Sequence, residues 1–165
     1  MPSQINAVVI TVSDACSRGE REDTSGKVLV ELLLELGAEI VAASILSDDL
    51  EPLAEALRKF ADQPEVNLIV TTGGTGLAPR DNTPEATLAV IERAAPGLAE
   101  AMRNETLTQT PMAMISRGVC GIRSGTLIVN LPGSPKAVRE SFAVIAPVLK
   151  HAIALLAGNP GGDLH

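Results

Sequence analysis

Four runs of aliphatic residues, each followed by a segment with helical character, constrain the fold of this chain more than any other feature. The runs cover Ile5–Val12, Glu39–Leu46, Val66–Thr72 and Thr126–Leu131. Short apolar strands that alternate with helices are typical of βαβ units around a buried parallel sheet. We therefore expect an α/β fold with a mostly parallel sheet and helices on both faces. The glycine-rich span 116–125 is assigned neither helix nor strand.

Capping residues and prolines predict where the helices lie. Helices are expected to begin near Asp23 or Thr24, Ser47, Thr83, Pro96 and Ser134. Thr83 is predicted as the N-cap of a helix over 83–95, with Pro84 as its first residue, and Ser134 as the cap of the last helix. Pro147 should break or kink that last helix, because proline removes an internal hydrogen bond. The tail over 159–165 is expected to fray.

Length and composition favour one domain, residues 1–165, with a core over about 5–157. The chain has no Trp or Tyr and only two Phe, and its net charge is −7. Stacking surfaces for bases need aromatic side chains, and nonspecific nucleic-acid binding needs positive charge. We therefore expect no nucleic-acid partner.

Cysteine usage and hydropathy point to the cytoplasm. Cys16 and Cys120 lie far apart, which is neither a disulfide framework nor a metal-binding spacing, and free cysteines fit a reducing compartment. The N-terminus has no basic region of the kind found in signal peptides. No stretch approaches the roughly eighteen apolar residues of a membrane span. We expect a cytoplasmic protein without a membrane partner.

Four loops that follow strands carry small or acidic residues. Their sequences are "SDACSRG" from residue 13, "SDD" from 47, "GGTGLAPRD" from 73 and "PGSP" from 132. In open α/β sheets, ligands bind beyond the carboxyl ends of the strands. The glycines at 73, 74 and 76 suit close approach of an anion to the backbone, although a lone glycine turn is more often simply a tight turn with positive φ angles. The four loops together predict a phosphate or carboxylate site.

Standard catalytic motifs are missing. The spacing around Gly19 and Lys27 does not match G-x-x-x-x-G-K-[ST], and the turn from Gly74 does not continue as G-x-G-x-x-G. No Ser/His/Asp or Cys/His arrangement is legible, and neither His151 nor His165 has a metal-ligand partner. A P-loop NTPase, an NAD-type dehydrogenase and a nucleophilic hydrolase are therefore all disfavoured.

Charged residues of these loops are the candidates for metal and phosphate chemistry. The acidic ones are Asp14, Asp48, Asp49 and Asp81, and the basic candidates are Arg80, Arg117, Arg123 and Lys136. Two carboxylates that face a phosphate can hold Mg²⁺, or can orient a nucleophile. The structural alternative for each acid is a helix cap or a solvated surface group, and for each base an exposed cation.

Several motifs together resemble one known family. They are "TTGGTGLAPRDNTPEAT" from residue 71, "TVSD" from 11, "DTSG" from 23, "TPMAMISRGVCGIR" from 110 and "LIVNLPGSPKAVRES" from 127. This set is similar to the molybdenum-cofactor biosynthesis domain of the MogA and MoaB proteins, over about residues 5–157. "SRG…GIR" and "NLPGSPK" resemble the MogA-like branch more than MoaB.

The resemblance implies a three-layer α/β/α sandwich and a nucleotidyltransferase, molybdopterin adenylyltransferase. Such an enzyme transfers AMP from Mg-ATP to the terminal phosphate of molybdopterin and releases pyrophosphate. The family commonly forms homotrimers, and a molybdate-insertion enzyme is the expected recipient of the product. The alternatives are a MoaB-like protein that binds molybdopterin without catalysis and, more remotely, a nucleotide-cofactor hydrolase.

The resemblance also implies roles for particular residues. Asp48 and Asp81 match the family's essential acids, which are expected to hold Mg²⁺ and orient phosphates. Ser47 stands where relatives often have proline, so Asp49 remains an alternative to Asp48. The residues expected to bind substrate are Ser13, Asp14, Gly73, Gly74, Thr75, Gly76, Arg80, Ser116, Pro132, Gly133 and Ser134.

Overall fold

The computed structural model describes residues 4–159. The expected fraying of the tail concerns residues that lie, apart from residue 159, outside this range. The strands are β1 (Asn6–Val12), β2 (Glu39–Leu46), β3 (Leu68–Thr72), β4 (Arg93–Ala94), β5 (Cys120–Arg123) and β6 (Thr126–Leu131). The helices are α1 (Asp14–Ser17), α2 (Thr24–Glu35), α3 (Leu50–Ala61), α4 (Thr83–Val90), α5 (Pro96–Leu107), the 3-10 helix η1 (Pro111–Ile115) and α6 (Pro135–Leu156).

The six strands form one mixed sheet in the order β2-β1-β3-β6-β5-β4. The four strands predicted from aliphatic runs pair in parallel, β1 with β2 and β3, and β3 with β6. β5 and β4 extend this sheet in antiparallel orientation beyond β6. The expected α/β class with a mostly parallel sheet is confirmed.

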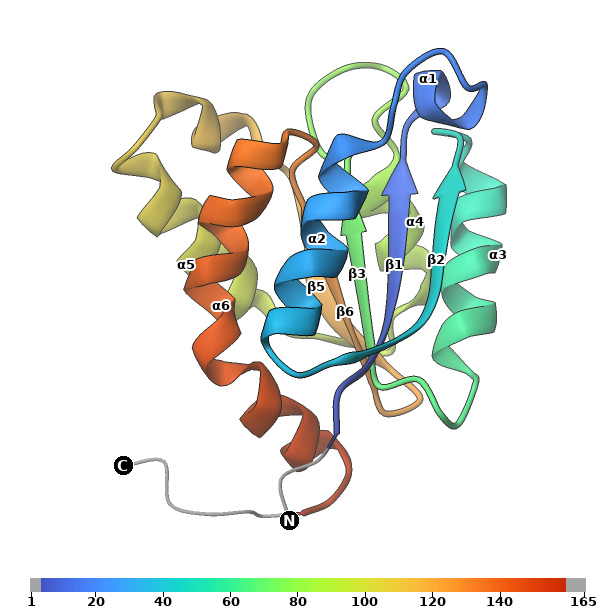
Figure 1. Ribbon diagram of the computed structural model, residues 1–165, viewed down its shortest axis with the longest axis vertical. Helices are drawn as coiled ribbons and strands as arrows, with labels where there is room; N and C mark the ends of the chain where they lie inside the picture. Colours follow the sequence, from blue (N-terminus) through green and yellow to red (C-terminus); the bar gives the residue numbers. More distant parts are fainter. Residues whose placement is uncertain (1–3, 160–165) are drawn as a thin grey trace.

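Helices cover both faces of the sheet, which gives the three layers of an α/β/α sandwich (Figure 1). On one face, α2, α5 and α6 bury side chains such as Leu29, Met102 and Phe142 against the sheet. On the other face, α3 and α4 bury Leu53 and Val90. In the central strands β1, β3 and β6, alternate residues serve the two cores, which is why these strands read as continuous apolar runs.

The glycine-rich span predicted as irregular contains a strand, β5, and the helix predicted over 83–95 is shorter than expected. α4 ends at Val90 because Ile91 is extended, with ψ of 147°. The following residues turn to pair with β5, and the N–H of Glu92 donates to the carbonyl of Ile122 at 2.8 Å. Edge pairing therefore replaces the last helical turns.

Pro147 lies inside α6 without ending it. Leu149 and Ile153, beyond the proline, are fully buried. Their packing holds the second half of the helix, which Figure 1 shows changing direction, so the expected kink occurs and the expected break does not.

Among the described residues, no helix combines the length and the apolar character that crossing a bilayer would require.

Candidate functional site

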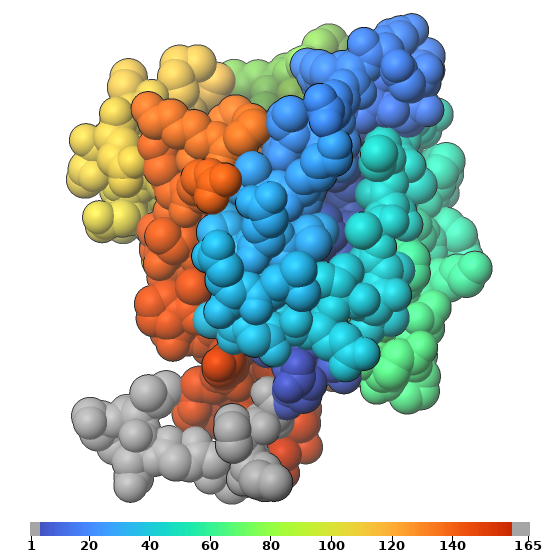
Figure 2. Space-filling model, viewed as in Figure 1, coloured from blue at the N-terminus to red at the C-terminus, as the bar shows by residue number. Residues whose placement is uncertain are grey.

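The loops that follow β1, β2, β3 and β6 meet at the carboxyl edge of the parallel strands, as predicted from the sequence. They surround a cavity of about 490 Å³, which we call the four-loop cavity. Its walls include Ser13, Arg21, Asp48, Gly73, Gly74, Asp81, Gly133 and Ser134. Figure 2 shows the same rim at the top of the molecule, where the segments after β1 (blue) and β3 (green) lie.

The glycine turn after β3 forms one wall with its backbone. Gly73 and Gly74 have φ angles of 99° and 69°, in the left-handed region that favours glycine. A side chain at Gly73 would collide with the carbonyl of Val12 at the end of β1. The turn is thus pressed against a neighbouring strand end, and it presents peptide groups rather than side chains to the cavity. Such walls suit an anion that must come close to the chain.

The prediction that Thr83 caps α4 is wrong by one position. Asn82 is the N-cap residue, and its side chain makes no capping hydrogen bond but donates to the carbonyl of Asp48 at 3.0 Å. Thr83 is the first residue of the helix and is fully buried. Its hydroxyl donates to the carbonyl of Gly73 at 2.9 Å, so Thr83 braces the glycine turn rather than the helix end.

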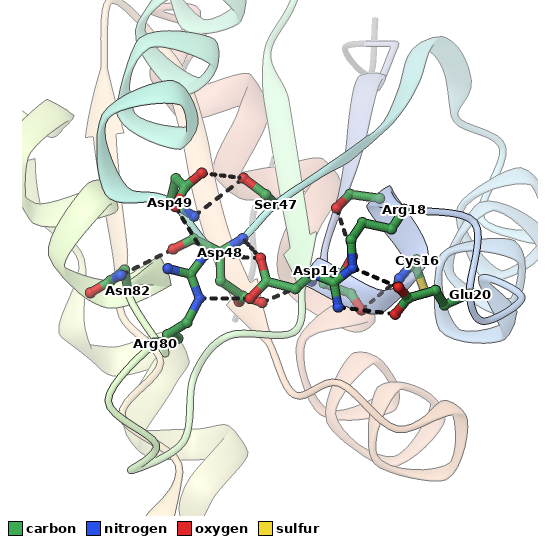
Figure 3. A network of polar contacts seen from close by, with 11 residues as sticks. Asp14, Cys16, Arg18, Glu20, Ser47, Asp48, Asp49, Arg80 and Asn82 are labelled. Carbon is green, nitrogen blue, oxygen red and sulfur yellow. Dashed lines mark hydrogen bonds and ion pairs between the residues drawn. The ribbon is translucent and has the colours of Figure 1, made fainter.

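Asp14 and Asp48 lock the loops after β1 and β2 together. The N–H of Asp14 donates to Oδ2 of Asp48 at 2.9 Å, and the N–H of Asp48 donates to Oδ1 of Asp14 at 3.0 Å. Figure 3 shows the two carboxylates crossing between the loops. Each acid thus fixes the backbone of the other loop.

The environments of these two acids shift their pKa values in opposite directions. A hydrogen bond from Arg80, aided by the N–H of Asp48, lowers the pKa of Asp14 to about 2. Burial raises the pKa of Asp48; the N–H of Asp14 opposes this shift, while the nearby charges of Asp14 and Asp81 add to it. A partly buried carboxylate beside like charges is stabilised by a cation.

Arg80 is engaged by two acids from other loops. Its Nε and Nη2 donate to the carboxylate of Asp14 at 2.7 and 3.0 Å, and Nη2 also donates to Asp49 at 2.9 Å (Figure 3). Asp49 lies at the surface, where Arg80 and then Ser47 lower its pKa by hydrogen bonding. Of the two neighbouring acids, Asp48 lines the cavity and Asp49 does not.

Asp81 reaches the four-loop cavity from the far end of the glycine loop. Its Oδ2 accepts from the N–H of Ala78 at 3.0 Å, and its own N–H donates to the carbonyl of Ala78 at 2.9 Å. The loop therefore sets the direction of this carboxylate, next to Asp48.

A second, more apolar cavity of about 270 Å³ lies beside the first. We call it the α5 cavity, because Ala99, Met102 and Arg103 of α5 line it. Ser116 and Pro132, which the sequence analysis assigned to the site, lie here and not in the four-loop cavity. Gly133 and Ser134 line both cavities, so the turn before α6 separates two neighbouring spaces.

The remaining candidates lie behind or away from the cavities. Thr75 is buried, and its carbonyl accepts from the N–H of Arg117 at 2.8 Å; the carbonyl of Gly76 accepts from the Arg117 side chain at 2.7 Å. Arg123 pairs with Asp62 near the opposite edge of the sheet. Lys136 is an exposed side chain at the start of α6.

Arg21 is a residue that sequence reasoning missed. It lines the four-loop cavity, and its Nη2 approaches the Ser13 hydroxyl at 3.3 Å. It is the one cation in the described lining, against the acids Glu22, Asp48 and Asp81. The signal was present, since Arg21 closely follows "SDACSRG", but an arginine in a polar loop is usually a surface residue.

The donor set suits a hard cation held jointly by protein and ligand. The described residues contain no cluster of three or more His, Cys, Asp or Glu side chains placed to hold a metal ion. Asp48 and Asp81 instead offer two carboxylates on one cavity wall. Mg²⁺ is commonly bound through one or two carboxylates together with phosphate oxygens and water.

Comparisons with known proteins agree on one family. The family described as probable molybdopterin binding domain matches residues 8–151. Molybdopterin adenylyltransferase of Helicobacter pylori J99 is 41% identical over 162 residues, which cover 94% of this chain and 89% of that protein. The molybdenum cofactor synthesis protein cinnamon of Drosophila melanogaster is 46% identical over 149 residues, but these span only 25% of its length.

The fold agrees with solved structures as well. The molybdopterin biosynthesis enzyme MoaB of Thermus thermophilus superposes with a TM-score of 0.89 at 48% identity, covering 95% of this chain and 99% of that one.

Proposed function

The chain belongs to the family of probable molybdopterin binding domains that serve molybdenum-cofactor biosynthesis, and we propose that it is a molybdopterin adenylyltransferase. In this reaction AMP passes from ATP to the terminal phosphate of molybdopterin. The family supports a role in the chemistry of this cofactor, and the enzyme of Helicobacter pylori carries the activity in its name at 41% identity. The whole reaction, with its substrates and partners, is our proposal for this chain.

The observation that carries the proposal is the pair of neighbouring cavities with a shared wall. The four-loop cavity has peptide walls, two carboxylates and an arginine, which suits phosphate groups. The α5 cavity is mostly apolar and suits the heterocyclic ring of one substrate. Joining two phosphorylated heterocycles requires both environments side by side.

The proposed transfer requires mainly that the two substrates are positioned and that their negative charges are offset. An oxygen of the pterin phosphate attacks the α-phosphorus of ATP; the new P–O bond forms as the bond to the β-phosphate breaks, and pyrophosphate leaves with the electron pair. The attacking phosphate is already ionised at neutral pH, so no strong base is needed. Asp48 and Asp81 are therefore proposed to orient phosphates and metal rather than to remove a proton.

We propose that Asp48 and Asp81 hold Mg²⁺ together with phosphate oxygens of ATP. Bound there, Mg²⁺ supplies positive charge that offsets repulsion between the two polyanions. The excess of acids over cations in the cavity lining supports a divalent cation at this place. Arg21 is proposed to bind a phosphate of ATP directly, because Arg80 is already occupied by Asp14 and Asp49.

The direct test incubates the purified protein with molybdopterin, ATP and MgCl₂ and follows adenylylated pterin by mass spectrometry and pyrophosphate by a coupled assay. Stoichiometric formation of both products is expected, and EDTA should abolish it. Folded protein that binds the pterin without forming either product would identify a binding protein instead of an enzyme.

The proposal also covers how the chain assembles, where it works and which enzyme receives its product. On the family resemblance, we propose a cytoplasmic homotrimer that passes its product to a molybdate-insertion enzyme. Light scattering behind size exclusion should give three times the 17.1 kDa chain mass. A mass of one or two chains at micromolar concentration would contradict the trimer.

A further inference from the structure

Arg117 holds both ends of the loop that carries Asp81. It lies between η1 and β5 and lines neither cavity. We infer that Arg117 is a positioning residue for the transfer reaction, which fixes the carboxylate of Asp81 against the four-loop cavity. The inference rests on the proposed function, since it assigns Asp81 a part in that reaction.

The guanidinium of Arg117 reaches across the loop over 76–81. Its Nε donates to the carbonyl of Gly76 at 2.7 Å, and Nη2 donates to the carbonyl of Asp81 at 2.7 Å. The third nitrogen, Nη1, donates to both carboxylate oxygens of Glu85 in the first turn of α4, at 2.9 Å each. One side chain thus joins the start of the loop, its end and the following helix.

The backbone from which Arg117 extends is itself anchored in the core. The Arg103 side chain donates to the carbonyl of Gly118 at 2.7 Å. The N–H of Val119 donates at 3.1 Å to Oδ1 of Asn130, which is buried in β6. The support for Asp81 therefore runs from the central sheet through Arg117, and not only through the short loop.

The shape of the loop that Arg117 holds determines where the carboxylate of Asp81 points. Because the carboxylate and N–H of Asp81 both bond to Ala78, the orientation of the carboxylate depends on the shape of the loop. Without Arg117, the carbonyls at both ends lose their donor and the loop is free to reshape. A displacement of about 1 Å at a reacting group can lower turnover about a hundredfold.

Only arginine fits this position. Its planar group offers five donors in fixed directions and so meets two carbonyls and a carboxylate at once. Lysine keeps the charge but presents a single ammonium, which cannot reach all three acceptors.

The test compares Arg117→Ala and Arg117→Lys with Arg123→Ala. Arg123 is the matched control, because it also donates to a carboxylate, Asp62, and to a carbonyl, Val90, but far from the cavities. Hydrogen exchange followed by mass spectrometry on peptides over 74–84 should be at least about tenfold faster in Arg117→Ala, and unchanged in Arg123→Ala. Turnover at saturating substrates should fall about 10–100-fold, the usual effect of removing a group that orients a metal ligand.

A double-variant cycle separates positioning from general destabilisation. If Arg117 acts through Asp81, adding Arg117→Ala to Asp81→Asn should lower turnover by less than about threefold more. The turnover and the exchange rate of Arg117→Lys should lie between those of wild type and Arg117→Ala. If Arg117→Ala does not fold, the single variants Arg117→Lys and Glu85→Gln are measured in its place.

Three results would overturn the inference: unchanged exchange over 74–84, wild-type turnover in Arg117→Lys, or fully multiplicative effects in the cycle. An inactive wild type would refute the proposed function and with it the role of Arg117 in turnover, whereas the exchange measurement separately decides whether Arg117 holds the loop.

Discussion

Replacing Asn130 with alanine removes a side chain that joins four parts of the structure. Asn130 lies in β6 and is 2% exposed. Its Oδ1 accepts from the N–H of Val119 at 3.1 Å, and its Nδ2 donates to the hydroxyls of Thr71 in β3 and Thr87 in α4 at 3.1 and 3.0 Å. Both threonines are fully buried, so the variant leaves polar groups without partners inside the protein.

The expected loss of stability follows from these contacts. The half-buried N–H of Val119 loses its partner at a cost of about 1–2 kcal/mol, and each of the two lost bonds to the buried threonine hydroxyls costs about 1 kcal/mol. Asn130 also lines the α5 cavity, through which water can reach part of the vacated space and lower the cost. We expect a loss of about 3 kcal/mol, a large fraction of the roughly 5–15 kcal/mol typical of a domain.

Asn67→Ala is the matched control. Asn67 also bridges backbone groups, accepting from the N–H of Asn6 and donating to the carbonyl of Gln4, both at 2.8 Å. These groups lie near the surface, where water replaces the lost bonds, so we expect a loss of about 1 kcal/mol. Urea unfolding followed by circular dichroism measures the free energy of unfolding of both variants, provided the slope m is the same as in wild type. Equal losses in the two variants, or less than about 1 kcal/mol for Asn130→Ala, would refute the reasoning.

Three further predictions concern the site. Asp81→Ala should lower turnover at least about a hundredfold without shifting the urea midpoint. Asp49→Ala removes an exposed ion pair and should change turnover less than about threefold. Equal effects of the two variants would contradict the assignment of Asp81, and not Asp49, to the site. Arg21→Ala should raise the KM for ATP about tenfold, since it removes a charge-assisted bond to phosphate, and an unchanged KM would exclude that contact. Because Arg80 lowers the pKa of Asp14 to about 2, the stability that this carboxylate contributes should be complete above about pH 4 and lost as the pH falls through about 2. A carboxyl ¹³C titration by NMR should give a midpoint near 2, and one near 4 would show that the contact with Arg80 is absent in solution.

The fold was largely predictable because the buried strands carry a strong local signal. β2 and β6 have the predicted bounds, and the predicted bounds of β1 and β3 are too wide by one and two residues at the start. The strands β5 and β4, at one side of the sheet, were not predictable. β5 has four residues, one of them Gly121, where a side chain would collide with Ile91, so its glycine reflects tertiary packing that looks like a loop in the sequence. α4 ends early for the same reason, because pairing with β5 overrides helical propensity.

The place of the site could be predicted from the topology of the sheet, but the pairing of its charged side chains could not. Loops that follow parallel strands must share an edge, so Asp48, Asp81 and the glycine turn were expected together. Which cations face the cavity depends on partners from distant loops. Arg80 is held by acids of two other loops, and Arg117 by carbonyls of its neighbour loop, while Arg21 lines the cavity. The local sequence does not encode the pairing of Arg80 and Arg117, because their partners come from other loops.

The turn at Gly133 and Ser134 has a thermodynamic consequence, because it is a wall of both cavities. A ligand that selects one position of this turn changes the free energy of binding in the adjacent space. By linkage, if one ligand changes the affinity of the other by some factor, its own affinity changes by the same factor. Titrating either substrate in the presence of the other would then measure one and the same coupling energy, to which the shared turn contributes.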